Sequence, residues 1–383
     1  MGKSACFKLF RSISIAVLVL TAVGAPLSMA SEKPSDGAKK VRWAWRKNFS
    51  NARLGNLAMA WNGARIVFSV TETVPGTAKG DVIVGVDNDG KVIRDWRISD
   101  KKIKKISING EGKRLLVELD DGALLFYEDW EKEKGPVKIK GPASGAVLSP
   151  KGDYILTGLS QKGGKPKVLS TSGDLLWSPE TPVSDGWKAI FPFFNNENRV
   201  LLVSKDGEAL LNEKEKTVWK AKVKGTPIAL ASSYLEGDVT AVLSNAEIQF
   251  INGKGAVTGT APFPGNMGSL SCSDTGNICA ASANNSEGQL ISVYTSDGKK
   301  LWGATLKSTA KSGPAVFVAA HGETVIAGIE ENGGWSLRAW DKNGNVAWSA
   351  PVEGGLADFK VSWNGKRIAA LTMDGRTAFF DLK

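Results

Sequence analysis

A hairpin signal recurs along almost the whole sequence, and its spacing limits the folds that the chain can adopt. Each copy is an apolar run, a short turn such as Asn-Gly, and a second apolar run, a pattern that predicts two antiparallel strands. Consecutive copies lie 39 to 49 residues apart, and a repeat of this length indicates one structural unit per copy. The turns are anchored at Gly63, Gly112, Gly152, Asn196, Gly237, Gly276, Gly322 and Gly365.

A second element follows each hairpin: a polar turn and a short strand that often carries tryptophan. The pattern Gly-x-x-x-Trp is complete at 173–177, 298–302 and 344–348, and looser copies end at Trp96 and Trp219. Four short strands in each repeat are typical of a β-propeller blade. We therefore expect an all-β, eight-bladed β-propeller, with a seven-bladed ring as the alternative.

The two ends of the repeat region predict how the ring closes. The last unit stops near residue 381 after its third strand, whereas residues 39–45 precede the first hairpin and look like a fourth strand with Trp43. We expect this N-terminal strand to complete the last blade and so remove an open sheet edge. Residues 41–383 would then form a single domain. A row of separate β-sandwiches would not explain a partial repeat at each end.

The turn-and-tryptophan element, as in Ser-Asp-Gly-Lys-Lys-Leu-Trp302, resembles the repeat of the PQQ-like (quinoprotein dehydrogenase-like) eight-bladed propellers. The hairpins around Gly152 and Gly365 resemble WD-repeat blades as well. The family includes dehydrogenases that hold pyrroloquinoline quinone (PQQ) and calcium, and non-catalytic members such as the propeller lipoprotein of the outer-membrane β-barrel assembly machine. The tryptophans expected to stack between blades are Trp43, Trp96, Trp177, Trp219, Trp302 and Trp348.

The residues favour the non-catalytic members. No two cysteines are adjacent, as they are in the dehydrogenases, and no residue can be matched to the family's cofactor site. His321 is the single histidine of the chain, so a multi-histidine metal site is excluded. We therefore expect no catalytic, cofactor-binding or metal-binding residue. The alternative is a quinoprotein-type enzyme that binds PQQ or another small ligand in the central channel.

The first thirty residues have the pattern of a secretory signal peptide. Lys3, Lys8 and Arg11 precede an apolar run at 13–23, and Ser28 and Ala30 fit a cleavage site. Removal of residues 1–30 lowers the formal charge from +10 to +7, and residues 31–40 form a polar leader. We expect an exported, monomeric protein, periplasmic or extracellular, without a transmembrane span after cleavage.

Cys272 and Cys279 are the cysteines that remain after cleavage, and they flank one of the predicted turns. In an oxidising compartment this placement predicts a disulfide across the hairpin. The alternative is a pair of buried free thiols.

Lysines gather in connections that we assign to one face of the ring, opposite the tight turns. Such a face predicts binding of a protein or of an anionic polymer, but not of nucleic acid, because no aromatic residues alternate with the lysines. The alternative is that these are ordinary solvated loop residues. The lysines are Lys101, Lys102, Lys104, Lys105, Lys134, Lys138, Lys140, Lys220, Lys222 and Lys224.

Overall fold

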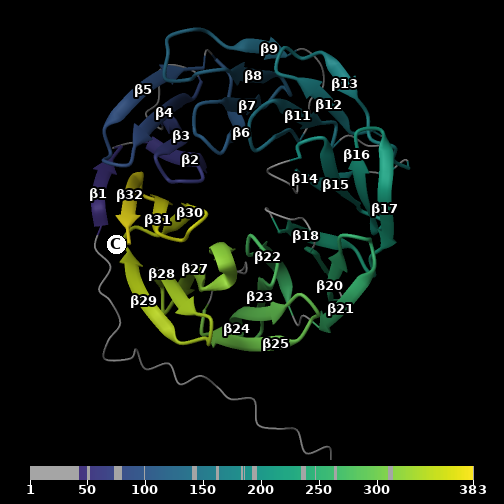
Figure 1. The fold of residues 1–383 in the computed structure, drawn as a ribbon. Helices are drawn as coiled ribbons and strands as arrows, with labels where there is room; N and C mark the ends of the chain where they lie inside the picture. Colours follow the sequence, from purple (N-terminus) through teal and green to yellow (C-terminus); the bar gives the residue numbers. More distant parts are fainter. Residues whose placement is uncertain are drawn as a thin grey trace, which may run out of the picture.

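A computed structural model shows eight four-stranded antiparallel sheets arranged as blades around one axis (Figure 1). It describes residues 43–49, 52–72, 80–98, 100–139, 145–160, 164–182, 184, 186–191, 196–233, 239–245, 247–262, 265–308 and 314–382. Within these ranges the only helical element is the 3-10 turn η1 (Ala320–Gly322). The prediction of an all-β, eight-bladed propeller is confirmed.

The blades are numbered in chain order. Blade 1 consists of β2 (Ala52–Met59), β3 (Arg65–Glu72), β4 (Val82–Asp87) and β5 (Val92–Arg97), and blade 2 of β6 (Ile103–Ile108), β7 (Leu115–Leu119), β8 (Leu124–Tyr127) and β9 (Val137–Ile139). Blade 3 consists of β10 (Val147–Leu148), β11 (Tyr154–Thr157), β12 (Lys167–Ser170) and β13 (Leu175–Trp177), and blade 4 of β14 (Trp187–Ile190), β15 (Arg199–Ser204), β16 (Glu208–Glu213) and β17 (Lys216–Lys222).

The second half of the ring has the same order. Blade 5 consists of β18 (Pro227–Ser232), β19 (Val239–Ser244), β20 (Glu247–Asn252) and β21 (Val257–Pro262), and blade 6 of β22 (Asn266–Cys272), β23 (Ile278–Asn285), β24 (Gly288–Thr295) and β25 (Lys300–Leu306). Blade 7 consists of β26 (Val316–Val318), β27 (Thr324–Glu331), β28 (Gly334–Asp341) and β29 (Val346–Val352), and blade 8 of β30 (Leu356–Val361), β31 (Arg367–Thr372), β32 (Arg376–Asp381) and β1 (Trp43–Asn48).

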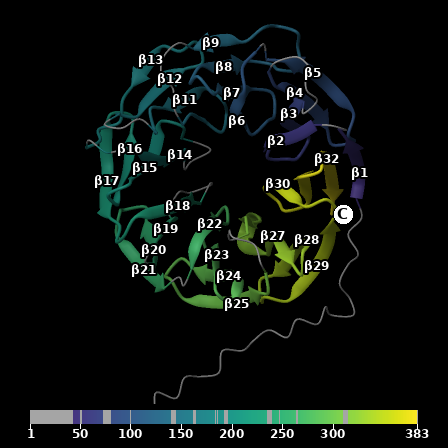
Figure 2. The same ribbon diagram turned by 180° about the vertical axis from the view of Figure 1, so that it is seen from behind.

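The N-terminal strand closes the ring, as predicted. Strand β1 pairs antiparallel with β32, with Lys47 opposite Thr377 and Asn48 opposite Arg376. Both views show β1 beside β32 at the periphery (Figures 1 and 2). Arg46 adds an ion pair to Glu353 in the connection that leads into blade 8, at 3.2 Å.

The hydrophobic core is divided among the seams between blades. Each buried cluster that the structure describes combines residues of two neighbouring blades. On β3, for example, Val67 packs toward blade 2, whereas Ile66 and Phe68 pack toward blade 8. Successive residues of a strand point to opposite faces of the sheet, so a strand between two seams is apolar at most of its central positions. This explains why the second and third strands are continuous apolar runs.

The connections between strands alternate between two faces of the ring. The turn face carries the connections from first to second strand of each blade and from third to fourth strand of blades 1 to 7, since the fourth strand of blade 8 is β1. The loop face carries the connections from second to third strand and from each blade to the next. The first strands lie nearest the axis and the fourth strands at the periphery (Figure 1).

On the turn face, main-chain hydrogen bonds join the first turns of five consecutive blades. The amide of Ala320 donates to the carbonyl of Trp363 at 2.8 Å, and the amide of Trp363 to that of Trp61 at 2.9 Å. The amide of Trp61 then donates to Gly110 at 3.1 Å, and that of Gly110 to Pro150 at 2.7 Å. Proline has no amide hydrogen, so this series ends at Pro150.

The next seam, between blades 3 and 4, uses a side chain instead. The amide of Lys151 donates to a carboxylate oxygen of Glu197, which belongs to the first turn of blade 4 and is buried. The first turns of blades 7, 8, 1, 2, 3 and 4 are therefore held to one another on this face.

Candidate binding surfaces

Five of the predicted lysines lie at the loop face. Lys101 and Lys102 belong to the connection between β5 and β6, and Lys224 to the connection between β17 and β18. Lys104 and Lys105 lie near the start of β6, the innermost strand of blade 2. The structure therefore places these five residues on the face to which the sequence assigned them.

The other lysines do not all share this position, and one assignment is corrected. Lys134 lies between β8 and β9, a third-to-fourth connection, so it is on the turn face. Lys138 and Lys220 lie on the peripheral strands β9 and β17, whereas Lys222 ends β17 and donates to Asp206 in the connection between β15 and β16, so it is a sixth lysine on the loop face. Lys140 lies outside the described residues. A single basic rim containing all ten lysines is therefore not what the topology produces.

Carboxylates offset part of the positive charge on the loop face. Lys101 pairs with Asp121 at 3.2 Å, and Lys224 lies 3.7 Å from Glu247. These lysines are well exposed, so each pair contributes little to stability. Their effect is to reduce the positive field that a partner would meet on this face.

Glu118 holds the most enclosed of these ion pairs. Its side chain is 3% exposed, and it accepts a hydrogen bond from Lys104 Nζ at 2.6 Å. Its two oxygens also accept the amides of Gly145 and Ala146 in blade 3, each at 3.1 Å. Burial raises the pKa of Glu118, but these hydrogen bonds outweigh burial and hold the pKa below its ordinary value. The ionised carboxylate thus links blades 2 and 3.

Lys105, the next residue, has no such carboxylate. Its Nζ donates to the carbonyl oxygen of Ala146 at 2.9 Å. Burial lowers the pKa of Lys105, Glu118 opposes that effect, and Lys104 adds to it. Lys105 is exposed as a whole residue, although its ammonium has enough protein around it for burial to be the largest effect on its pKa.

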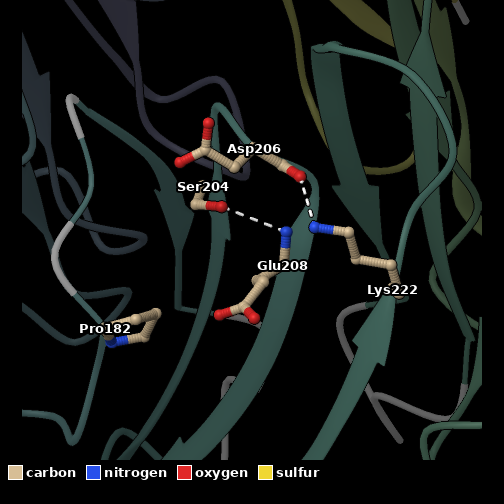
Figure 3. A pocket seen from close by; sticks show the side chains of 5 residues that line it. All are labelled: Pro182, Ser204, Asp206, Glu208 and Lys222. Atoms are coloured by element: carbon tan, nitrogen blue, oxygen red, sulfur yellow. Dashed lines mark hydrogen bonds between the residues drawn. The ribbon is translucent and has the colours of Figure 1, made fainter.

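A small open pocket of about 170 Å³ lies on the loop face beside blade 4 (Figure 3). Lys222 Nζ donates to the carbonyl oxygen of Asp206 at 2.7 Å, and the amide of Glu208 donates to Ser204 Oγ at 3.0 Å. Ligand sites for small molecules commonly measure about 300 to 1,000 Å³. The pocket is smaller than that, and the ammonium of Lys222 already donates a hydrogen bond within the protein. Its lining consists of Pro182, Ser204, Asp206, Glu208 and Lys222.

The fourth-strand tryptophans pack between blades. Trp302 of blade 6 lies under the turn of blade 7, where a Cβ on Gly344 would come 2.9 Å from its Cγ, and its Nε1 donates to Lys342 at 3.2 Å. Trp219 meets Gly255 of blade 5 in the same way, at 2.8 Å from its Cβ. Trp177, Trp219 and Trp348 are buried. The side chain of Trp43 lies outside the described part of the structure.

The seam between blades 1 and 2 contains a residue that the sequence analysis did not single out. Trp130 lies in the connection between β8 and β9, is fully buried, and stacks on Trp96 with ring centroids 6.0 Å apart. Its Nε1 donates to the carbonyl of Gly112 at 2.7 Å. Trp96 donates to Tyr127 Oη at 3.0 Å. Trp130 is absent from the Gly-x-x-x-Trp pattern, so only its position in a long connection could have pointed to it.

The predicted disulfide between Cys272 and Cys279 is present. The two residues lie directly opposite each other on β22 and β23. The bond closes the first hairpin of blade 6 within a buried cluster that spans blades 5 and 6.

Neither a metal site nor a membrane-spanning helix occurs in the part of the chain that the structure describes. Among the described residues, no group of three or more His, Cys, Asp or Glu side chains is placed to hold a metal ion. His321 lies on the turn face, with Nδ1 3.4 Å from the buried carboxylate of Asp274. No helix within the described ranges is long and apolar enough to cross a membrane.

Comparisons with known proteins identify the fold. No family model matches the sequence, and no curated protein matches it. BamB from Moraxella catarrhalis is similar in structure, with a TM-score of 0.60 and 13% identity over 89% of this chain and 99% of BamB.

Two structures of Sqt1 are also similar. Sqt1 from Chaetomium thermophilum, bound to the N-terminus of ribosomal protein L10, has a TM-score of 0.65 and 16% identity over 89% of this chain and 100% of Sqt1. Sqt1 from Saccharomyces cerevisiae has a TM-score of 0.68 and 12% identity over 90% and 99% of the two chains. The resemblance to propeller repeats is thus confirmed as a shared fold.

Proposed function

We propose that this protein is an exported, non-catalytic propeller that binds a protein partner through the loop face. The observation that carries the proposal is the difference between the two faces. As the described strands bound them, the loop-face connections of seven to nine residues are those between β3 and β4, β9 and β10, β11 and β12, β13 and β14, and β25 and β26, whereas on the turn face those between β8 and β9 and between β14 and β15 reach that length. The first turns on the opposite face are short in most blades and are bound to one another in five of them. Variable connections on a rigid scaffold are common binding surfaces.

The comparisons support a binding role by analogy, because the Chaetomium thermophilum propeller was solved with a segment of another protein. Export is supported by the signal-like pattern at residues 1–30. Both remain proposals for this chain.

Affinity capture from the native cell envelope tests the proposal. We expect the wild-type protein to retain one major partner and to begin at Ser31 in mass spectra. The variant Lys102→Glu with Lys224→Glu should lose that partner, because it reverses two charges on the loop face. The matched variant Lys254→Glu with Lys342→Glu changes the same charge on the turn face and should retain it. Equal capture by both variants would reject the loop face as the binding surface.

A further inference from the structure

The innermost strands carry an excess of positive charge. As the structure describes these eight strands, Asp358 is their one carboxylate, and it pairs with Lys360 at 2.9 Å. Lys104 pairs with Glu118 of the second strand. The remaining cations have no ion pair among the described residues, and we call them the inner cluster: Arg53 on β2, Lys105 on β6 and Lys188 on β14.

The inner cluster lies near the axis, toward the loop face. Every innermost strand runs from the loop face to the turn face. Arg53 and Lys188 are the second residues of β2 and β14, and Lys105 is the third residue of β6, so all three lie in the half nearer the loop face. All three are exposed. Blades 1, 2 and 4 therefore each place one of these positive charges on an innermost strand, in its half nearer the loop face.

The neighbouring Glu118 shows how a carboxylate is bound here. It takes one ammonium, from Lys104, and two main-chain amides, from Gly145 and Ala146. Lys105 lies beside it with only the neutral oxygen of Ala146. Cations without an ion pair attract anions, and the attraction is stronger where protein excludes part of the water around them. A second carboxylate, supplied from outside, would meet the same chemistry.

We propose that the inner cluster binds an acidic peptide segment of a protein partner, with carboxylates paired to Arg53, Lys105 and Lys188. This inference rests on the proposed binding function and names the chemistry of the partner. A peptide is favoured over an acidic polysaccharide because β2, β6 and β14 are edge strands of their sheets. Edge strands present main-chain groups that an extended peptide can pair with.

Fluorescence anisotropy of a labelled decaglutamate peptide, titrated with the purified protein, tests the inference. We expect saturable binding that weakens as salt increases. The variant Lys105→Gln with Lys188→Gln should weaken binding on the order of tenfold, because it removes two charge pairs. Lys220→Gln with Lys254→Gln removes the same charge elsewhere and should stay within about twofold of wild type. Matching thermal melts of both variants exclude misfolding as the cause.

Three outcomes would overturn the inference: no binding by the wild-type protein, equal losses in both variants, or competition by polygalacturonate as strong per carboxylate as that by decaglutamate. The last would assign the cluster to polysaccharide. These failures are distinct from failure of the proposed function. A partner captured through the loop face without decaglutamate binding rejects the inner cluster alone, whereas decaglutamate binding without any captured partner rejects the scaffold role.

Discussion

Gly85 on β4 leaves the space that Trp130 occupies. A Cβ at Gly85 would lie 2.1 Å from Trp130 Cζ3, closer than any packed pair of carbon atoms. The indole is fully buried, and its Nε1 donates to the carbonyl of Gly112. It therefore cannot shift without losing packing contacts and this hydrogen bond. The absence of one methyl group at Gly85 thus decides how blades 1 and 2 fit together.

We expect Gly85→Ala to lower the free energy of unfolding by about 1–3 kcal/mol through overpacking. Urea unfolding followed by tryptophan fluorescence measures this change. Gly135→Ala is the control, because nothing lies within 4 Å of a Cβ at Gly135. In a double-mutant cycle with Trp130→Ala, the cost of Gly85→Ala should largely disappear. A full, additive cost would show that the clash with Trp130 is not the cause.

Two buried glutamates on neighbouring seams have pKa values that are shifted in opposite directions. Hydrogen bonds hold the pKa of Glu118 below its ordinary value of 4.5 despite burial. Burial raises the pKa of Glu197, and the amide of Lys151 only partly opposes it. Folding therefore favours ionisation of Glu118 and disfavours ionisation of Glu197, relative to the unfolded chain.

These directions predict how each residue affects stability with pH. The contribution of Glu118 is present above pH 4.5 and is lost as pH falls through its lowered pKa. Glu118→Gln should thus cost about 1–2 kcal/mol at pH 7 and less near pH 3. The penalty for ionising Glu197 appears as pH rises above 4.5, so Glu197→Gln should be neutral or stabilising at pH 7. Melting temperatures across this pH range decide the matter, and equal losses for both variants at pH 7 would contradict it.

At the scale of the element, closure of the ring depends on the single strand β1. Without β1, the edge of β32 from Arg376 to Phe380 loses its partner. We expect deletion of residues 31–48 to lower the melting temperature and to cause association through this free edge. Deletion of residues 31–40 removes only the polar leader and should do neither. Light scattering after gel filtration, with thermal melts, separates the two results; a monomeric, equally stable protein without β1 would be contrary to this role.

The hairpins were predictable because the glycine in a turn meets two requirements: the backbone conformation of the turn itself, and close contact with the neighbouring blade. Gly112 has a φ of 87°, which favours glycine, and a Cβ there would come 2.8 Å from Cβ of Arg65 in the preceding blade. One residue type satisfies both needs, so it recurs at the repeat spacing. Ring closure by the strand near Trp43 was predictable because the last repeat is incomplete. The disulfide was predictable because its two cysteines flank one turn symmetrically.

The charged surfaces were less predictable, because their position depends on where each strand lies within a blade. The sequence from Lys134 to Lys140 reads as one basic loop, yet β9 starts at Val137 and divides it. That short strand moves Lys134 to the turn face. Arg53 and Lys188 are single basic residues in otherwise mostly apolar strands, so no pattern marks them. Only the strand order brings them near the axis, and only the folded chain pairs Lys101 with Asp121.

At the scale of the whole molecule, the excess positive charge is divided between regions that differ in how far acidic residues of the protein neutralise it. Lys101 and Lys224 on the loop face form ion pairs, whereas the residues of the inner cluster form none among the described residues. Net charge therefore describes this protein poorly, and the arrangement around the axis matters more for what it can bind.

Pairing of β1 with β32 also sets the order of events during synthesis. Strand β1 is synthesised before blades 1 to 7, and its partner β32 only after them, because Lys47 and Thr377 are far apart in the sequence. Contacts so distant in sequence form slowly, because closing a long loop costs entropy before any contact stabilises it. Blades 1 to 7 can each assemble from local hairpins, but blade 8 stays incomplete until the final residues arrive. An unfinished chain is thus an open arc rather than a ring, and it remains easier to unfold and thread through a pore than the finished protein.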